Sequence, residues 1–402
     1  MKRLFGLVAI LVAVVMGVCA GTSRADAECV AKEPSYTVTV PGRPFSVREL
    51  PDSTTALVSV NPETPLQVPG IAVLVCKADR FVYDHMIPMS PQPTGLALTP
   101  DGKVLVVADD SYIAFLRTDR LSRGSPDAIT YVKAETGDIE DDDAGATYVS
   151  VSPDGRYAFV SEEQAGTITV VDLVKAAATG YSRGAIVGDI DVGNAPITTL
   201  FASDGKTLYG TVEIVHRKLG YPKVCRPEGA AVSDPTRFAS GAVFSLDVGE
   251  AERGSGSSLT FAPAQCSAVR MALAPGGRFV WVTNRASGSV SLFDLLKMTG
   301  DASTARVNDI SVGSNPVPVA VTRDGSYVLV GITNRFGPGG TTSGRVIVLD
   351  GGTHRIVGTI PAGLFPREFS HGSGPTLFLS NNRSDSVTIF NENLLGQLIM
   401  KR

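Results

Sequence analysis

Seven tight-turn signals, roughly fifty residues apart, run through almost the whole chain and constrain its architecture more than any other feature. Each signal combines Pro, Asp, Ser or Gly between two short apolar runs. Their middle residues are Asp52, Asp101, Asp154, Asp204, Gly276, Asp324 and Ser373. Internal repeats of this length that contain short strand-like segments are typical of a radial propeller with one repeat per blade. The spacing therefore predicts seven blades.

The segments within each repeat have the length and composition of β-strands. Residues 157–160 and 167–171 are one such pair, and residues 279–282 and 289–293 are another. β-branched and aromatic residues dominate these runs, and none is long enough for a good amphipathic helix. We expect an all-β fold: a seven-bladed β-propeller of four-stranded antiparallel blades. Residues 36–40 resemble an outer strand, so we expect this N-terminal strand to complete blade seven and close the ring, which leaves no open sheet edge.

The N-terminus and the charge limit where the chain works and what it binds. Lys2 and Arg3, the apolar run 4–18 and the small residues around Ala27 have the pattern of a cleavable secretory signal. We therefore expect a signal peptide over 1–27, a single propeller domain over 28–402, and a periplasmic or secreted protein. The alternative is that the N-terminal segment is retained as an anchor. No further stretch is apolar enough to span a membrane. A net charge of −4 does not favour a nucleic-acid partner. We expect a monomer.

Four cysteines remain after residue 27, an even number that suits an oxidising compartment: Cys29, Cys76, Cys225 and Cys266. None of them forms a C-x-x-C spacing, so neither a zinc knuckle nor covalent haem is indicated, and we expect no cofactor. Of the three possible connectivities, the propeller topology selects one. Cys29 and Cys76 fall at the face that carries the first-to-second strand turns, whereas Cys225 and Cys266 fall in loops of adjacent blades at the opposite, top face. We predict the disulfides Cys29–Cys76 and Cys225–Cys266.

Three elaborations fall on the top face. The longest interval, 72 residues, contains an insertion over 214–240 in blade four, and a shorter insertion spans 335–343. Long loops in compact folds are usually functional or disordered. The third elaboration is the acidic segment with Asp138, Glu140, Asp141, Asp142 and Asp143. These carboxylates are candidate calcium ligands, but they lack the alternation and the glycine of an EF-hand loop. A solvated charged loop is the alternative that we favour, and we predict no metal site.

Three Asn-Arg pairs follow the second strands of blades five to seven and supply Arg285, Arg335 and Arg383. Arginine suits bidentate binding of carboxylate or phosphate, so these residues are candidate ligand-binding residues on an arc of the top rim. The alternative is that each arginine packs across a blade interface. His216 on the long insertion is the histidine that we expect to face a ligand, although a solvated basic loop with Arg217 also explains it.

The repeats resemble a known family. Residues 152–160 with 166–172, and residues 279–284 with 288–294, are similar to the YVTN-type repeats of exported bacterial propellers, such as YncE-like proteins and the seven-bladed lactonase family. The resemblance covers roughly residues 35–395. It implies a β-propeller and a group that includes ligand-binding proteins, lactone hydrolases and cofactor-bearing dehydrogenase subunits. It carries no catalytic residue across, because the matching positions are structural.

Two functions remain open. The first is an exported binding protein that recognises an anionic small molecule, polymer or protein partner on its top face. The second is a lactonase-like hydrolase, which would need a water-activating base and a stabiliser for the oxyanion in the central channel. The candidate catalytic residues are Arg270, Arg367 and Glu368, and a buried ion pair between blades explains them equally well. Charged groups that converge within the channel would favour hydrolysis, and a bare channel with a charged rim would favour binding.

Overall fold

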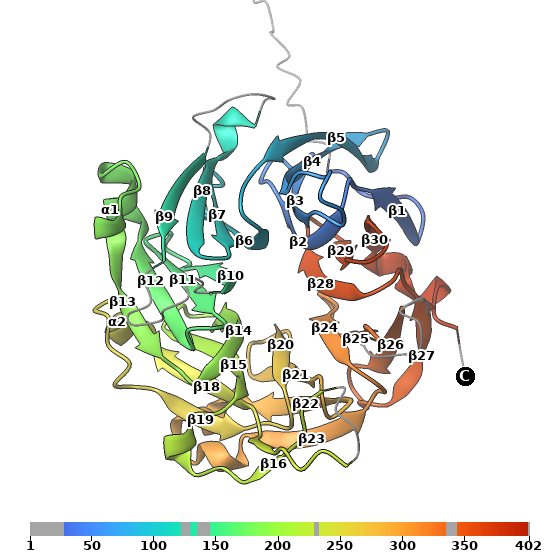
Figure 1. Ribbon diagram of the computed structural model, residues 1–402. Coiled ribbons are helices and arrows are strands. Elements are labelled where there is room, and N and C mark those ends of the chain that lie inside the picture. The colour runs from blue at the N-terminus through green and yellow to red at the C-terminus, as the bar shows by residue number, and fades with distance from the viewer. Residues whose placement is uncertain (1–27, 122–128, 135–144, 229–232, 335–343, 401–402) are drawn as a thin grey trace, which may run out of the picture.

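Seven four-stranded antiparallel sheets stand around a central axis, as the repeat spacing predicts (Figure 1). The computed structural model describes residues 28–121, 129–134, 145–228, 233–334 and 344–400. Within each sheet the strands follow one another from the axis outwards, and only blade seven departs from sequence order. No helix in these ranges is both long and apolar enough to cross a membrane.

Blades one to four take up the first two thirds of the chain. Their strands are β2 (Arg43–Glu49), β3 (Thr55–Asn61), β4 (Gly70–Lys77) and β5 (Arg80–Pro88); β6 (Pro93–Leu98), β7 (Val104–Asp109), β8 (Tyr112–Arg117) and β9 (Ile129–Lys133); β10 (Ala146–Val151), β11 (Tyr157–Glu162), β12 (Thr167–Asp172) and β13 (Ile186–Asp191); and β14 (Asn194–Phe201), β15 (Thr207–Ile214), β18 (Ala242–Asp247) and β19 (Thr260–Pro263).

Blades five to seven follow the same plan, with one strand borrowed from the N-terminus. Their strands are β20 (Ala268–Leu273), β21 (Phe279–Asn284), β22 (Ser289–Asp294) and β23 (Arg306–Ser311); β24 (Pro316–Val321), β25 (Tyr327–Ile332), β26 (Arg345–Asp350) and β27 (Ile356–Pro361); and β28 (Pro366–His371), β29 (Thr376–Asn381), β30 (Ser386–Asn391) and β1 (Ser35–Thr39). Two short helices, α1 (Leu173–Ala178) and α2 (Val248–Ala251), follow third strands.

The turn residues act as their chemistry predicts. In the first-to-second strand turn of blade three, Asp154 accepts a hydrogen bond from the backbone N–H of Arg156, and Gly155 has a φ of 72°. At the end of the third strand, Asp172 accepts a bond from the N–H of Lys175 and so caps α1. The repeated Asp residues therefore have structural roles, and candidate functional residues lie at other positions.

The apolar core is divided among the blade interfaces. Seven buried clusters pack between neighbouring sheets, and each draws its residues from two adjacent blades. Between blades three and four, for example, Phe159 packs with Phe244 and Leu208. Apolar burial is the main stabilising term in folding, so the ring is held together blade against blade and its axis is left for polar side chains.

The N-terminal strand closes the ring, as predicted. β1 pairs with β30 from Ser35 to Thr39, and it is the outermost strand of blade seven. The hydroxyl of Tyr36 accepts a hydrogen bond of 2.7 Å from the N–H of Phe81 in blade one. The Cys29–Cys76 disulfide joins the same two blades, with Cα atoms 5.8 Å apart. Blade seven is therefore tied to blade one both covalently and by hydrogen bonding.

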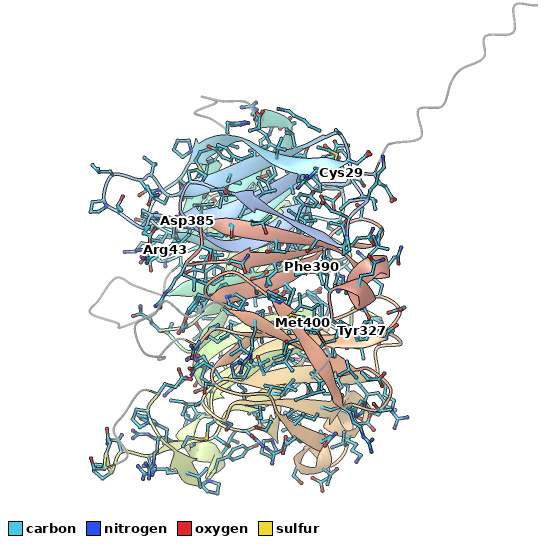
Figure 2. The ribbon with its side chains drawn as sticks, turned by 90° about the vertical axis from the view of Figure 1, so that its right-hand side faces the viewer. Cys29, Arg43, Tyr327, Asp385, Phe390 and Met400 are labelled. Atoms are coloured by element: carbon cyan, nitrogen blue, oxygen red, sulfur yellow. A yellow bond between two sulfur atoms is a disulfide. The ribbon has the colours of Figure 1, made fainter. Side chains whose placement is uncertain are left out.

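The two faces of the ring are distinguished in the side view. Figure 2 labels Arg43 and Asp385 at one face and Cys29 and Tyr327 at the other. Arg43 begins β2, and Asp385 lies in the loop between the second and third strands of blade seven, so theirs is the top face. Cys29 accordingly lies at the opposite face, as expected.

The long insertion of blade four is ordered by its own small sheet. Within residues 214–240, β16 (Lys223–Cys225) pairs with β17 (Phe238–Ala239). The Cys225–Cys266 disulfide ties β16 to the loop that leads into blade five, with Cα atoms 5.6 Å apart. Both predicted disulfide pairings are thus confirmed. The insertion is fastened at the top of the interface between blades four and five.

Candidate functional site

Every innermost strand changes register just after it begins, and this turns side chains toward the channel. The register shifts lie between Pro44 and Val47, Pro93 and Leu96, Ala146 and Tyr148, Pro196 and Thr199, Ala268 and Met271, Pro316 and Val319, and Pro366 and Glu368. An irregularity of this kind bends a strand and redirects a side chain. The residues within these shifts, such as Phe45, Arg270 and Arg367, are those that line the channel mouth.

Glu368 forms ion pairs with two arginines from other blades. Its Oε1 lies 3.0 Å from Nη1 of Arg48, and its Oε2 lies 3.5 Å from Nη2 of Arg270. Oε1 also accepts hydrogen bonds from the hydroxyls of Ser46, at 2.8 Å, and Ser370, at 3.4 Å. Arg270 and Glu368 are both buried. Blades one, five and seven therefore meet at one carboxylate, and two of the predicted catalytic candidates are brought together.

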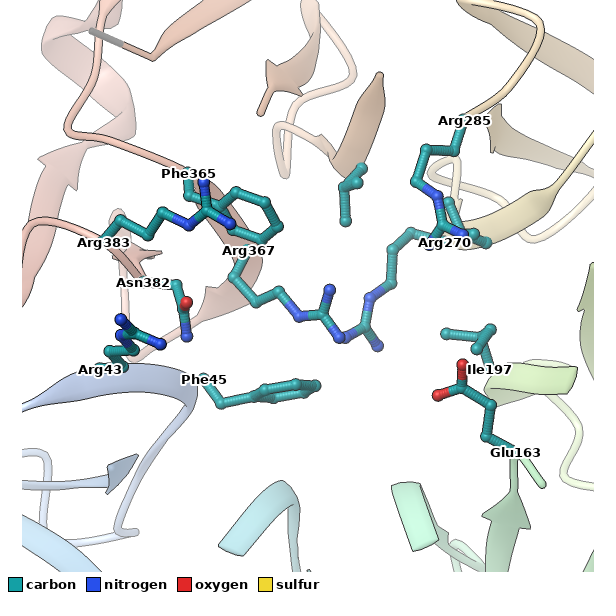
Figure 3. Close-up of a pocket in the computed structure, with 12 residues that line it drawn as sticks. Arg43, Phe45, Glu163, Ile197, Arg270, Arg285, Phe365, Arg367, Asn382 and Arg383 are labelled. Atoms are coloured by element: carbon teal, nitrogen blue, oxygen red, sulfur yellow. The ribbon is translucent and has the colours of Figure 1, made fainter. Parts of the chain in front are cut away.

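Aromatic rings hold the guanidinium groups in place. The guanidinium carbon of Arg270 lies 4.9 Å from the ring centre of Tyr148 and 5.6 Å from that of Phe45, and the Arg367 carbon lies 4.4 Å from the Phe45 ring. Such cation–π contacts orient a cation and lower the cost of partial desolvation. In Figure 3 the side chains of Arg270 and Arg367 point toward one another across the channel above Phe45.

Burial sets the ionisation of this cluster. Burial alone would lower the pKa of Arg48, but the charge of Glu368 and the hydroxyl of Tyr148 outweigh it and raise that pKa. Burial, helped by the Glu368 charge, also raises the pKa of Tyr148, so its phenol stays protonated near neutral pH. The phenol oxygen accepts a hydrogen bond from the Arg48 guanidinium. Arg48 keeps its positive charge.

A cavity of about 330 Å³ opens at the top of the channel, above this cluster. Figure 3 shows its lining side chains, which include five arginines and a single carboxylate, Glu163. The arginines are Arg43, Arg270, Arg285, Arg367 and Arg383. We call this cavity the mouth site. Its volume suits a small molecule or one end of a larger one.

Arg285 lines the mouth site but is already bound to two carboxylates. Its Nη2 lies 2.9 Å from Oε2 of Glu213 at the end of β15, and its Nε lies 2.7 Å from Oε1 of Glu228 in the insertion. Burial opposes its charge, yet the two carboxylates raise the pKa of Arg285 overall. In this structure Arg285 anchors the insertion to the rim, in addition to facing the mouth site.

The three Asn-Arg pairs do not occupy equivalent positions. The N–H groups of Arg285, Thr333 and Asn382 each donate to the residue that precedes an innermost strand, so these three residues are equivalent. Arg383 follows one position later, and its guanidinium carbon lies 4.8 Å from the ring centre of Phe365. The pairs are not equivalent because the second strands end at different distances from them: β21 ends on Asn284 itself, β25 ends at Ile332 and β29 ends at Asn381. Arg285 and Arg383 nevertheless line the same cavity, and Arg335 lies outside the described residues.

His216 does not line the mouth site. Its Nδ1 accepts a hydrogen bond of 3.2 Å from the N–H of Lys218, and its Nε2 lies 3.7 Å from Asp191. It lines a separate cavity beneath the insertion. The acidic residues Asp138, Glu140, Asp141, Asp142 and Asp143 lie outside the described residues, and the described part of the chain contains no cluster of His, Cys, Asp or Glu that could hold a metal ion.

Several site residues escape the sequence reasoning. Arg43, Phe45, Arg48 and Tyr148 all lie on innermost strands, at or next to the register shift. The available signal is a polar or aromatic residue near the start of an innermost strand. It is weak, because a regular alternation would place half of these side chains in the interface between blades.

Comparison with known proteins supports the fold and goes no further. No protein-family model matches the sequence, and no curated protein does either. Among solved structures, the chain is similar to the Kuenenia stuttgartiensis hydrazine synthase, with 18% sequence identity and a TM-score of 0.61 over 88% of this chain and 96% of that one. In all, 1286 solved chains match, and a fold shared so widely does not indicate one function.

Proposed function

We propose that this protein is an exported binding propeller that holds a multivalent organic anion in the mouth site. The observation that carries the proposal is the composition of the lining, in which five arginines face a single carboxylate. Guanidinium groups form paired hydrogen bonds with carboxylate and phosphate groups. Arg43, Arg270 and Arg285 already form ion pairs with carboxylates outside the lining. An anion with two or more such groups would therefore share these guanidinium groups with their partners and would also meet Arg383 at the rim.

The surroundings of the arginines suit recognition. Arg270 and Arg367 are held against aromatic rings, so little side-chain freedom is lost when a ligand binds. Arg383 rests on Phe365 at the exposed rim, where it can meet an arriving anion. The cavity admits a small di- or tricarboxylate, or the anionic end of a polymer or protein partner.

Export is the second part of the proposal. Two disulfides each join neighbouring blades of the ring, and disulfides persist in oxidising compartments. The N-terminal sequence pattern and the likeness to YVTN-type repeats are those of exported propellers. We place the mature chain in the periplasm or outside the cell.

A lactonase-like hydrolase is the alternative, and one observation favours it. Arg270, Arg367 and Glu368 converge in the channel, the arrangement expected of a catalytic site. However, Oε1 of Glu368 already accepts bonds from Ser46, Arg48 and Ser370, and Oε2 lies beside Arg270. Most of the hydrogen-bonding capacity of Glu368 is thus used, and only Oε2, which accepts no hydrogen bond among the described residues, could take a proton from water. We therefore favour binding over hydrolysis.

Calorimetric titration with citrate at constant ionic strength tests the binding proposal. We expect Arg383→Ala to make the free energy of citrate binding less favourable by roughly 1.5–3 kcal/mol, the usual contribution of a hydrogen bond to a charged group. Its melting temperature should stay close to that of the wild type, because exposed charges contribute little to stability. Arg253→Ala, which removes an exposed arginine after α2 on the opposite face, is the matched control. A large loss of melting temperature with unchanged citrate binding would overturn the proposal.

A hydrolysis assay distinguishes the lactonase-like hydrolase from the binding protein. Turnover of a panel of γ- and δ-lactones that disappears in Glu368→Gln, while the variant stays folded, would favour the enzyme. Citrate binding without lactone turnover would favour the binding protein.

A further inference from the structure

The insertion of blade four covers a second cavity, larger than the mouth site and separate from it. Its volume is about 590 Å³. The lining residues come from the end of β15, from the segment after it and from the β16–β17 hairpin: Asn194, Ile214, Val215, His216, Arg217, Tyr221, Lys223, Thr236, Arg237, Phe238 and Ala239. We call this cavity the insertion site. It shares no lining residue with the mouth site.

One side of the insertion site is apolar. Val215 is buried, Ile214 and Ala239 are half-buried, and the ring of Phe238 remains 37% exposed. A phenylalanine with that much exposed surface in a hollow loses contact with water when a second apolar group packs on it, which favours binding. This side therefore fits a flat or branched hydrocarbon body.

The other side is cationic. Arg217, Lys223 and Arg237 line it, and no carboxylate is among the described lining residues. This is notable in a chain whose net charge is −4. Arg217 and Lys223 are exposed, and neither forms an ion pair among the described residues. An anionic head group would therefore meet charges that are free to reorient toward it.

The roof over the cavity is anchored. β16 carries both Lys223 and Cys225, and the Cys225–Cys266 disulfide fixes this strand to the loop before blade five. The hydroxyl of Tyr221 donates to the carbonyl of Phe261 on β19 at 3.4 Å, a long bond. In Figure 1 the segment that carries β16 lies over the edge of the ring beside blade five. The hairpin thus holds the cavity walls in place without a ligand.

We propose that the insertion site binds an amphipathic organic monoanion, a compound with an aromatic or branched apolar body and one carboxylate or sulfonate head. The apolar body would pack on Phe238 and Val215, and the head would lie between Arg217 and Lys223. This site is independent of the mouth site, which has the opposite character: many charges and little apolar surface.

A matched set of probes tests this chemistry. We expect 2-naphthoate to bind the full-length mature protein in a calorimetric titration. The isosteric neutral 2-naphthamide should bind at least tenfold more weakly, because it lacks the charge. Acetate should not bind measurably at this site, because it lacks the apolar body. Equal binding of the acid and the amide would overturn the proposed role of the cationic side.

Variants locate the site. The double variant Arg217→Ala/Lys223→Ala should lower the affinity for 2-naphthoate about tenfold and leave the affinity for 2-naphthamide unchanged. The control Lys175→Ala/Lys206→Ala removes two exposed lysines of the opposite face and should change neither. Ala239→Leu, which extends a side chain into the cavity, should abolish binding of both probes at an unchanged melting temperature. Should Arg383→Ala weaken 2-naphthoate instead, the probe occupies the mouth site and the inference is wrong.

Discussion

Glu368 supplies the negative charge that two guanidinium groups of the channel share. Arg48 and Arg270 approach it from blades one and five, and the Arg270 and Glu368 side chains are only 6% and 5% exposed. A buried charge without its partner is strongly destabilising, whereas a satisfied cluster fixes the geometry of everything packed around it. Glu368 thus holds in place Arg270, which lines the mouth site.

Replacement of Glu368 with Ala should lower the free energy of unfolding by about 3 kcal/mol, the scale measured when one partner of a buried ion pair is removed. Glu368→Gln keeps the volume and one acceptor oxygen for Ser46, so it should lose less. Urea unfolding of both variants measures the difference. A Glu368→Ala protein as stable as the wild type would show that the two arginines are solvated in the channel.

Asp109 provides a pH-dependent test at the residue scale. It ends β7, its Oδ1 accepts a bond from the N–H of Gln92, and its Oδ2 has no hydrogen-bond partner among the described residues. In blade five the equivalent residue is Asn284, which donates to Ser289 and Ser291. Burial raises the pKa of Asp109 to about 6, with a further contribution from Asp110.

Because the pKa of Asp109 in the folded protein lies above the ordinary value of 3.8, the folded state favours the protonated form. Its contribution to stability is therefore present at low pH and is lost as the pH rises from about 4 to about 6. We expect Asp109→Asn to remove this part of the dependence, so that melting temperatures of variant and wild type diverge between pH 4 and pH 7. Parallel curves would contradict the assignment.

At the scale of the element, β1 is the strand on which ring closure depends. It packs Tyr36 and Val38 into the cluster between blades seven and one. The Tyr36 hydroxyl also accepts a hydrogen bond from the N–H of Phe81, which lies near the start of β5 in blade one. β1 thus joins the ends of the chain by packing as well as by hydrogen bonding.

Tyr36→Phe should lower the free energy of unfolding by about 1–3 kcal/mol, because it leaves the Phe81 N–H buried and unsatisfied. Tyr83→Phe is the matched control, since the Tyr83 ring lies at the surface. Chemical denaturation of the two variants gives the comparison. An equal effect of both substitutions would mean that the Tyr36 bond adds nothing to closure.

The repeats made the blades, the closing strand and both disulfides predictable, because turn chemistry and strand period act locally and recur seven times. The site was predictable only in part. Arg270 and Glu368 could be placed on innermost strands. The contact of Glu368 with Arg48, however, joins residues 320 positions apart in the chain and depends on register shifts that no local pattern reveals. The different positions of Arg383 and Arg285 also depend on strand ends, since β29 ends one residue earlier relative to its Asn-Arg pair than β21 does.

At the scale of the whole molecule, the insertion and the mouth site are joined through one arginine. Glu228 of the insertion binds Arg285, and Arg285 lines the mouth site. A second carboxylate, Glu213, binds the same guanidinium from β15. Glu228 therefore competes with an anionic ligand in the mouth site for hydrogen bonds from the Arg285 guanidinium.

Glu228→Gln should strengthen citrate binding at the mouth site. The change removes one negative charge beside the cavity and leaves Arg285 with Glu213 as its partner, so the gain should be about 1 kcal/mol, or roughly fivefold in affinity. Calorimetric titration against the wild type measures it, with Glu252→Gln on the opposite face as a control for the change in net charge. If citrate affinity stays constant while the insertion becomes sensitive to protease, Glu228 serves only to anchor the insertion, and Arg285 does not contribute to the mouth site.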